Sequence, residues 1–80
     1  MNITVLYFAR FREAMGFDRE ALQGEFATVN DVRKALLELG HRDVLAERNL
    51  MCARNEDLCS LAEPVSEGDQ IAFFPTVTGG

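Results

Sequence analysis

The sequence predicts a single α+β domain, in which one main helix packs on one face of a mixed sheet of four to five strands. Three observations support this prediction. Residues 2–26 contain two strand-like segments, residues 28–40 have the apolar spacing of a helix, and residues 50–74 contain two or three more short strands. A strand pair followed by a helix and further strands is typical of α+β domains. With 80 residues, the chain can bury one modest core.

The first strand is expected at Asn2–Ala9, which is rich in β-branched and aromatic residues. Side chains alternate along a strand, so one face carries Ile3, Val5 and Tyr7, and the other carries Thr4, Leu6 and Phe8. Both faces are largely apolar, which indicates a central strand. A connector with one helical turn is expected at Phe11–Gly16. A more polar strand follows at Arg19–Phe26, paired antiparallel with the first.

The clearest helix begins after Thr28, a favourable N-cap residue, and Asp31 completes an acidic capping box. The next positions follow the i, i+3, i+4, i+7 spacing of a buried stripe: Val32, Ala35, Leu36 and Leu39. Gly40 stands where a left-handed C-terminal cap is expected. The sequence therefore predicts one helix with defined ends.

The second half of the chain contains short strands separated by turn residues. They are expected at Leu50–Arg54, Leu58–Leu61 and Gln70–Phe74. Pro75 cannot donate a hydrogen bond to a sheet, so strand pairing should stop there. The domain is therefore expected to span residues 1–75, and residues 76–80 are expected to form a flexible tail.

Composition excludes several classes of function. The net charge is -5, from 13 acidic and 8 basic residues, which disfavours nucleic acid and mildly favours a protein partner with a basic surface. No apolar run approaches the roughly 20 residues needed to span a membrane. Arg10 and Arg12 follow the first apolar run, unlike the charges of a signal peptide, so a cytoplasmic location is expected. In that reducing compartment Cys52 and Cys59 should remain thiols.

The distinctive feature is the C-terminal Gly79-Gly80. The chain has one histidine and no phosphate-binding glycine loop, so it lacks the residues of a free-standing enzyme. Glycine has no Cβ, and two glycines can therefore pass through a narrow channel into another protein. A carboxylate is a poor acyl donor until it is activated, so an ATP-dependent partner would be required.

Three stretches resemble the small subunit of molybdopterin synthase, a sulfur carrier of the ubiquitin-like β-grasp family. They are Val5–Glu13, Gly68-Asp69 and Phe73–Gly80. The family end usually reads F-F-P-P-V-[ST]-G-G, and here Thr76 stands where a second proline is common. Related thiamine-pathway carriers share Gly-Gly but are shorter and usually lack the Phe-Phe-Pro run. The resemblance implies a β-grasp fold with the first and last strands side by side.

The resemblance also implies the chemistry. A ubiquitin-activating-like adenylyltransferase uses ATP to convert the Gly80 carboxylate into an acyl-adenylate, and sulfur from a donor enzyme replaces AMP to give a thiocarboxylate. The tail then enters the large subunit, which supplies the catalytic side chains, and sulfur passes to cyclic pyranopterin monophosphate for molybdenum cofactor biosynthesis. This chain is then a non-catalytic, sulfur-donating subunit of a heterotetramer, with no permanently bound cofactor.

The expected site has two parts. Gly80 is the reacting residue, with Gly79 beside it. The expected partner-binding surface comprises Phe8, Arg12, Leu58, Phe74, Pro75, Val77 and Thr78. Phe8 and Phe74 follow from strand alternation, because they lie with Leu6 opposite to the helix-facing side and would leave an exposed apolar patch. Leu58 is expected to join this patch from the neighbouring short strand, and such patches usually belong to interfaces.

Three alternatives remain open at this point. The chain could carry sulfur for thiamine or cysteine synthesis, or it could be a protein modifier attached to lysines through Gly80. It could also be a β-grasp interaction module with an idle tail. The sequence contains one lysine, Lys34, so ubiquitin-style chains would have a single side-chain attachment site.

Overall fold

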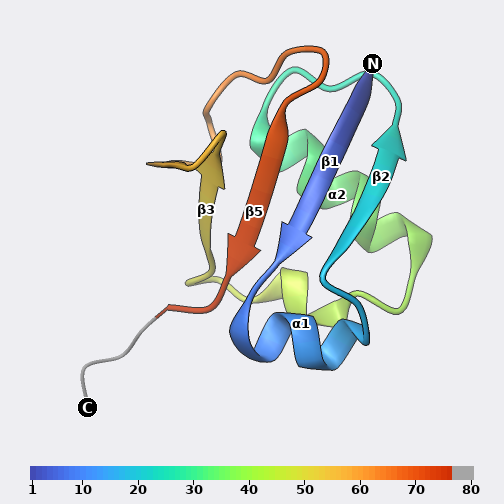
Figure 1. The fold of residues 1–80 in the computed structure, drawn as a ribbon, viewed down its shortest axis with the longest axis vertical. Helices are drawn as coiled ribbons and strands as arrows, with labels where there is room; N and C mark the ends of the chain where they lie inside the picture. The colour runs from blue at the N-terminus through green and yellow to red at the C-terminus, as the bar shows by residue number, and fades with distance from the viewer. Residues whose placement is uncertain (77–80) are drawn as a thin grey trace.

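The structure is a computed structural model that describes residues 1–76 (Figure 1). In chain order its elements are β1 (Asn2–Tyr7), α1 (Ala9–Met15), β2 (Arg19–Gln23), α2 (Val29–Leu39), the 3-10 helix η1 (Asp43–Ala46), β3 (Met51–Arg54), β4 (Asp57–Cys59) and β5 (Gln70–Phe74). The strands form one mixed sheet in the order β2-β1-β5-β3-β4. β1 and β5 are parallel neighbours, and the other pairs are antiparallel. The predicted α+β fold with adjacent first and last strands is confirmed.

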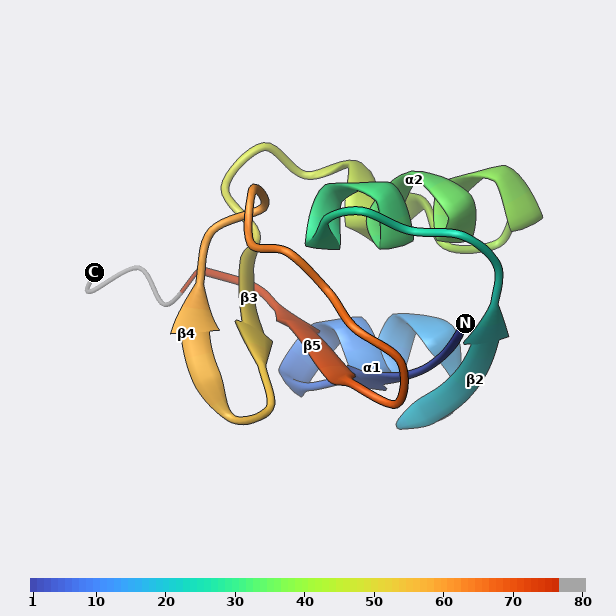
Figure 2. The same ribbon diagram turned by 90° about the horizontal axis from the view of Figure 1, so that it is seen from above.

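Helix α2 covers one face of the sheet, and within residues 1–76 no helix lies on the opposite face (Figure 2). The core lies between α2 and the sheet, with Ile3, Val5 and Tyr7 of β1 turned toward it. Its fully buried side chains are Ile3, Val5, Tyr7, Phe11, Val29, Val32, Leu36, Leu45, Ile71 and Phe73. The predicted capping box is present: the Thr28 hydroxyl accepts from the Asp31 N–H at 3.3 Å, and the Asp31 carboxylate accepts from the Thr28 N–H at 3.2 Å.

The segment expected as a connector is largely the helix α1. It spans seven residues, starts two residues before the predicted connector, and lies at the end of the sheet where β1 and β5 end (Figure 1). Only Phe11 within it is fully buried. One buried side chain gives no repeated apolar spacing, so the sequence pattern could not distinguish this helix from a loop. Its position is maintained by Phe11 packing in the core.

The end of α2 differs from the prediction in two ways. Leu39 is 57% exposed, because the buried stripe runs through Val29, Val32 and Leu36 and ends before the last turn. Gly40 has φ 85° and ψ 167°, so it is not in the left-handed helical conformation that was expected. Its N–H still bonds to the Leu37 carbonyl at 3.2 Å, which closes the helix.

The strands are shorter than predicted, except β5, whose bounds match. β1 ends at Tyr7, β2 ends at Gln23, β3 begins at Met51 and β4 stops at Cys59. β2 ends before Phe26 because Phe26 lies outside the sheet and packs into the core. Between α2 and β3, η1 buries Leu45 completely. Within residues 1–76, none of the helices has the length and apolarity required to cross a membrane.

A polar network secures the start of β5. Asp69 is 7% exposed, and its carboxylate accepts hydrogen bonds from Arg54 Nε at 2.7 Å, Asn55 Nδ2 at 3.0 Å and the Ser66 N–H at 2.7 Å. Arg54 also pairs with Glu63 at 3.2 Å. Buried carboxylates require such partners. The network ties the β3–β4 turn to β5, the strand from which the C-terminal residues extend.

Candidate functional site

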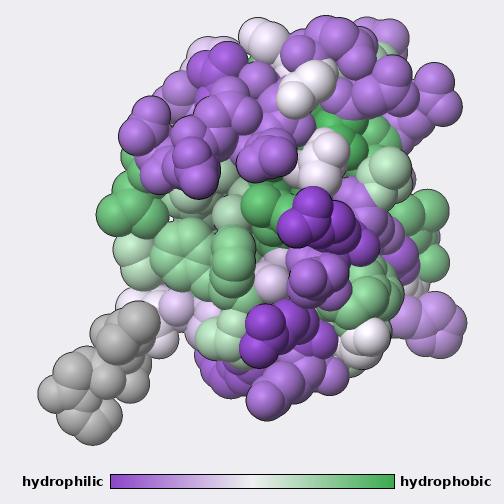
Figure 3. All heavy atoms as spheres, viewed as in Figure 1, coloured by the Kyte–Doolittle hydropathy of each residue, from purple (hydrophilic) through white to green (hydrophobic). Residues whose placement is uncertain are grey.

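The open face of the sheet contains an apolar hollow of about 280 Å³. Figure 3 shows apolar surface on this face, with polar surface above it and to its right. The residues around the hollow come from β1, β3, β4, β5 and the segments that join them: Leu6, Phe8, Ala53, Glu56, Leu58, Gln70, Ala72 and Phe74. Exposed apolar surface of this kind on a small domain usually belongs to a protein interface.

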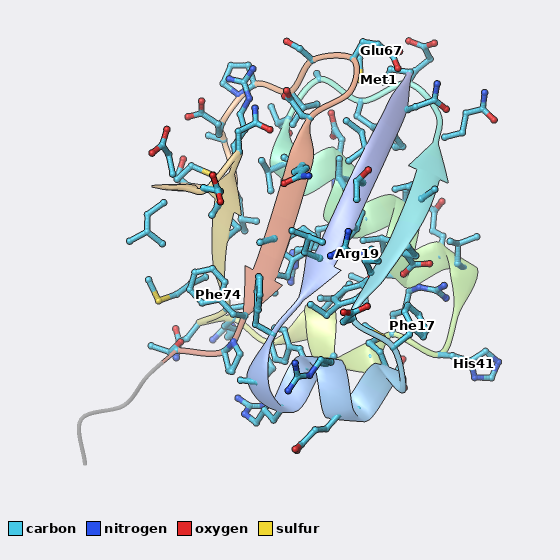
Figure 4. The ribbon with its side chains drawn as sticks, in the orientation of Figure 1. Met1, Phe17, Arg19, His41, Glu67 and Phe74 are labelled. Atoms are coloured by element: carbon cyan, nitrogen blue, oxygen red, sulfur yellow. The ribbon has the colours of Figure 1, made fainter. Side chains whose placement is uncertain are left out.

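Two aromatic rings form one wall of the hollow. The rings of Phe8 and Phe74 meet edge to face, with centroids 6.4 Å apart and an interplanar angle of 78°. Phe8 follows β1 in extended conformation, and Ala9 after it has φ 54°, which turns the chain into α1. Phe74 is the last residue of β5, at the end of the strand nearest the C-terminal residues (Figure 4). The wall therefore lies beside the point where the tail leaves the sheet.

Strand pairing brings Leu58 to the same face. Leu58 on β4 is the cross-strand partner of Ala53 on β3, which in turn pairs with Ala72 on β5. Ala53 and Ala72 are 7% and 8% exposed and form the floor of the hollow, while Leu58 is 68% exposed. Small residues on the two inner strands create the depression, and larger apolar residues surround it. The structure thus gathers Phe8, Leu58 and Phe74, three residues that the sequence analysis proposed for partner binding.

The other proposed partner-binding residues are distributed differently. Arg12 is exposed on α1, one turn after Phe8, and does not line the hollow. Pro75 is buried within this chain, so it offers little side-chain surface to a partner. The described residues do not include Val77, Thr78, Gly79 and Gly80. Most of the predicted tail, residues 76–80, therefore lies outside them.

Thr76, the last described residue, is tied to the segment just before β3. Its hydroxyl donates to the carbonyl of Asn49. The β3–β5 register pairs Met51 with Phe74, so Asn49 stands opposite Thr76 when that register is extended past Pro75. Proline has no N–H, and the threonine side chain continues the connection between the two segments. The base of the tail is therefore attached to the sheet beyond the end of β5.

Beside Thr76 lies a second, open hollow of about 420 Å³ that also involves Arg10, Glu47, Arg48 and Asn49. The Arg10 guanidinium binds the Glu47 carboxylate through two hydrogen bonds, at 2.7 and 2.9 Å. This pair lowers the pKa of Glu47 below its usual value. Sequence reasoning did not find this pair, because its members are far apart in the chain and neither belongs to a repeating pattern.

The two cysteines are cross-strand partners. Cys52 on β3 pairs with Cys59 on β4, and their Sγ atoms are 3.8 Å apart. Both are free thiols, and Cys52 is buried, whereas Cys59 is half-buried. Burial, with a smaller contribution from the neighbouring thiol, raises the pKa of Cys52 to about 12. At neutral pH this thiol is a packing residue rather than a nucleophile.

Comparison with known proteins identifies the family. Residues 5–80 match the ThiS family. The chain belongs to the ThiS family. Two curated relatives named molybdopterin synthase sulfur carrier subunit match it over 80 residues each, which is 98% of this chain and 99% of either relative. The protein from Haemophilus influenzae (strain Rd) is 44% identical, and that from Escherichia coli (strain K12) is 40% identical.

Solved structures agree on the fold of this ThiS-family chain. The crystal structure of SAMP1 from Haloferax volcanii matches with a TM-score of 0.81 and 25% identity over 100% of both chains. A chain in the complex of subunits 1 and 2 of the molybdopterin-converting factor from Helicobacter pylori 26695 matches with a TM-score of 0.69 and 22% identity, also over 100% of both chains. The second likeness shows the fold alone.

Proposed function

We infer that this chain is the sulfur carrier subunit of molybdopterin synthase. The observation that carries this inference is the full-length similarity to two proteins of that name, at 44% and 40% identity. The similarity includes the C-terminal region, since the family match extends to Gly80. The Gly79-Gly80 end supplies a terminal carboxylate on glycine backbone, which is the group that such chemistry requires.

The reaction at Gly80 proceeds in three steps. The Gly80 carboxylate attacks the α-phosphorus of ATP within an adenylyltransferase, which releases pyrophosphate and leaves an acyl-adenylate. Hydrosulfide delivered by a donor enzyme then attacks the acyl carbon and displaces AMP, which leaves a thiocarboxylate. Within the large subunit the thiocarboxylate sulfur finally bonds to cyclic pyranopterin monophosphate, and water hydrolyses the resulting thioester, which leaves the sulfur on the substrate and regenerates the Gly80 carboxylate. This chain presents the terminal group, and its partners supply the catalytic side chains.

The large subunit is the partner proposed for the apolar hollow. A neighbouring fold occurs in a complex of subunits 1 and 2 of a molybdopterin-converting factor, and the sulfur carriers named above are likewise subunits of a synthase. Phe74 lies at the wall of the hollow and is separated from Thr76, the last described residue, by only Pro75. A partner that covers the hollow would therefore sit where it can receive the tail. The assembly is proposed to be a heterotetramer in the cytoplasm.

Sulfur loading is tested by intact-mass spectrometry. The chain is incubated with ATP, the cognate adenylyltransferase and a sulfur source, and the expected product is heavier by the mass difference between sulfur and oxygen. Omitting ATP is the control, and it should leave the mass unchanged. If the complete mixture also leaves the mass unchanged while the relative from Escherichia coli is loaded by its own enzyme, the carrier function is wrong.

Replacement of Phe74 tests the partner surface. Phe74→Ala should weaken binding of the large subunit by at least about 1 kcal/mol, because an aromatic ring at the centre of an interface contributes strongly to affinity. Phe8→Ala should act in the same direction, since the two rings contact each other. Isothermal titration calorimetry measures the affinity, and circular dichroism checks the fold. Phe17→Ala is the control, because Phe17 is an exposed phenylalanine like Phe8, but its ring contacts Tyr7 at another part of the molecule. Wild-type affinity for both Phe74→Ala and Phe8→Ala would contradict the interface.

Loading of Gly80 does not by itself choose between pathways. A carrier for thiamine or cysteine synthesis would be loaded in the same way but would deliver sulfur to a different enzyme. A modifier would form isopeptide-linked adducts in cells. Delivery to the molybdopterin synthase large subunit, measured as molybdopterin formed in a purified mixture, is the result expected here.

A further inference from the structure

The turn between β3 and β4 contains a glutamate, Glu56, in a backbone conformation that is strained for most residues other than glycine. Its two central residues, Asn55 and Glu56, have φ of 50° and 75°. Positive φ at both positions is the requirement of a type I′ hairpin turn, for which Asn-Gly is a preferred pair. Asparagine tolerates this conformation, whereas glutamate pays a steric penalty that glycine avoids. Glu56 therefore occupies a position where glycine would be more stable.

The side chain of Glu56 has no visible structural function. Asn55 donates to the Asp69 carboxylate and accepts from the Gln70 N–H, so its side chain connects the turn to β5. Glu56 is exposed, and within residues 1–76 no hydrogen bond or ion pair from its carboxylate is seen. An acid that served solubility alone could stand at an unstrained position, as Glu38 does on α2. Solubility alone therefore does not explain why a glutamate occupies this strained position.

The location of Glu56 beside the apolar hollow indicates a function for its side chain. Glu56 lines the apolar hollow together with Leu58 and Phe74, on the face proposed to receive the partner. Ala9, another non-glycine residue with positive φ, directly follows Phe8 at the same hollow. Strained backbone conformations concentrate at functional sites, where the function compensates for the lost stability. The hollow therefore combines apolar anchors with one carboxylate held at its rim.

We propose that Glu56 is a specificity-determining residue that pairs with a Lys or Arg side chain of the protein partner at the rim of the hollow. The proposal rests on the proposed function, which assigns this face to the large subunit. The chain carries a net charge of -5, so a partner with a basic contact surface is complementary to it. A charge at the rim of an apolar contact accelerates association with the correct partner and disfavours partners of like charge.

Three variants test the proposal in the full chain, with binding to the cognate large subunit and thermal melting measured for each. Glu56→Gly should raise the melting temperature by about 4 °C, because it relieves the strain, and should weaken binding about fivefold at low salt. Glu56→Gln keeps the strain and loses the charge, so binding should weaken similarly with an unchanged melt. Glu56→Lys should weaken binding more than either variant, because it places like charges together.

Salt provides a second readout. All three losses of affinity should shrink when ionic strength rises from about 50 mM to about 500 mM, because screening shortens the range of charge interactions. Glu38→Gln is the control for a change of net charge, since Glu38 lies on α2 on the opposite side of the sheet (Figure 2), and it should bind within about twofold of wild type. Wild-type affinity for Glu56→Gln overturns the proposal, and so does a loss of affinity that salt does not change.

The outcomes separate this proposal from the interface on which it rests. If Phe74→Ala weakens binding and the Glu56 variants bind normally, the interface is correct and the role of Glu56 is wrong. If Phe74→Ala and the Glu56 variants all bind normally, both the interface and the role of Glu56 are wrong. A stabilised Glu56→Gly variant with weakened, salt-sensitive binding is the combination that a purely structural residue would not produce.

Discussion

Adding one residue after Gly80 should abolish sulfur loading while the protein melts at its normal temperature. Adenylation consumes the terminal carboxylate, and an added residue transfers that carboxylate to a different backbone carbon. Gly79→Val should also abolish loading or transfer, because a β-branched side chain would add bulk to glycine backbone that has to pass through a narrow channel. The loss should be complete within the detection limit of a molybdopterin-forming assay.

The melt is the essential control for this prediction. The core is assembled from residues 3–73, so changes at the C-terminal end should alter stability by less than about 0.5 kcal/mol. Thr76→Ser is a matched variant in the same predicted tail, since it keeps the hydroxyl and leaves Gly79 and Gly80 unchanged, and it should remain active. An extended chain that melts normally and still supports full activity would show that the terminal carboxylate is not the reacting group.

Asp69→Ala should destabilise the fold by about 2 kcal/mol, because it leaves buried hydrogen-bond donors without an acceptor. Asn55 Nδ2 and the Ser66 N–H both lose their bond to the carboxylate, and Arg54 retains only its contacts with Glu63 and Ser66. For a domain of this size, the melting temperature should fall by about 10 °C. Thermal or urea unfolding measures the change.

Asp57→Ala is the control for Asp69→Ala. Asp57 is an exposed carboxylate near the same turn, and its removal should change stability by less than about 0.5 kcal/mol. Equal stability of Asp69→Ala and wild type would show that the network around β5 does not contribute to stability.

The contribution of Asp69 should depend on pH in a defined direction. Burial acts to raise the pKa of this carboxyl, but hydrogen bonds from Asn55, Ser66 and Arg54 outweigh burial, so its pKa lies below the usual value. A carboxyl with a lowered pKa in the folded state stabilises the fold above its unfolded pKa of about 3.9, and this stabilisation is lost as pH falls further. The difference in unfolding free energy between wild type and Asp69→Ala should therefore be constant near neutral pH and shrink below about pH 4. A difference that grows toward acid pH would contradict the assigned cause.

The sequence alone determined the elements with strong local patterns. The alternation in β1, the bounds of β5, the Thr28–Asp31 capping box and the apolar stripe of α2 could all be read from neighbouring residues. The Gly-Gly end and its chemistry came from residue identity and from the resemblance that those residues carry. These features repeat or lie within a few positions, so side-chain spacing and backbone chemistry are sufficient to predict them.

Only the tertiary structure decided which side chains from distant segments are in contact. Helix α1 depends on one buried side chain, the Cys52–Cys59 contact depends on strand register, and the link between Arg54 and Asp69 crosses 15 positions of the sequence. The apolar hollow draws Phe8 from the region after β1, Leu58 from β4 and Phe74 from β5, and its depth comes from the small residues between them. Contacts between distant segments depend on how strands order and register in the sheet. That arrangement is set by packing of the whole core, which no local pattern encodes.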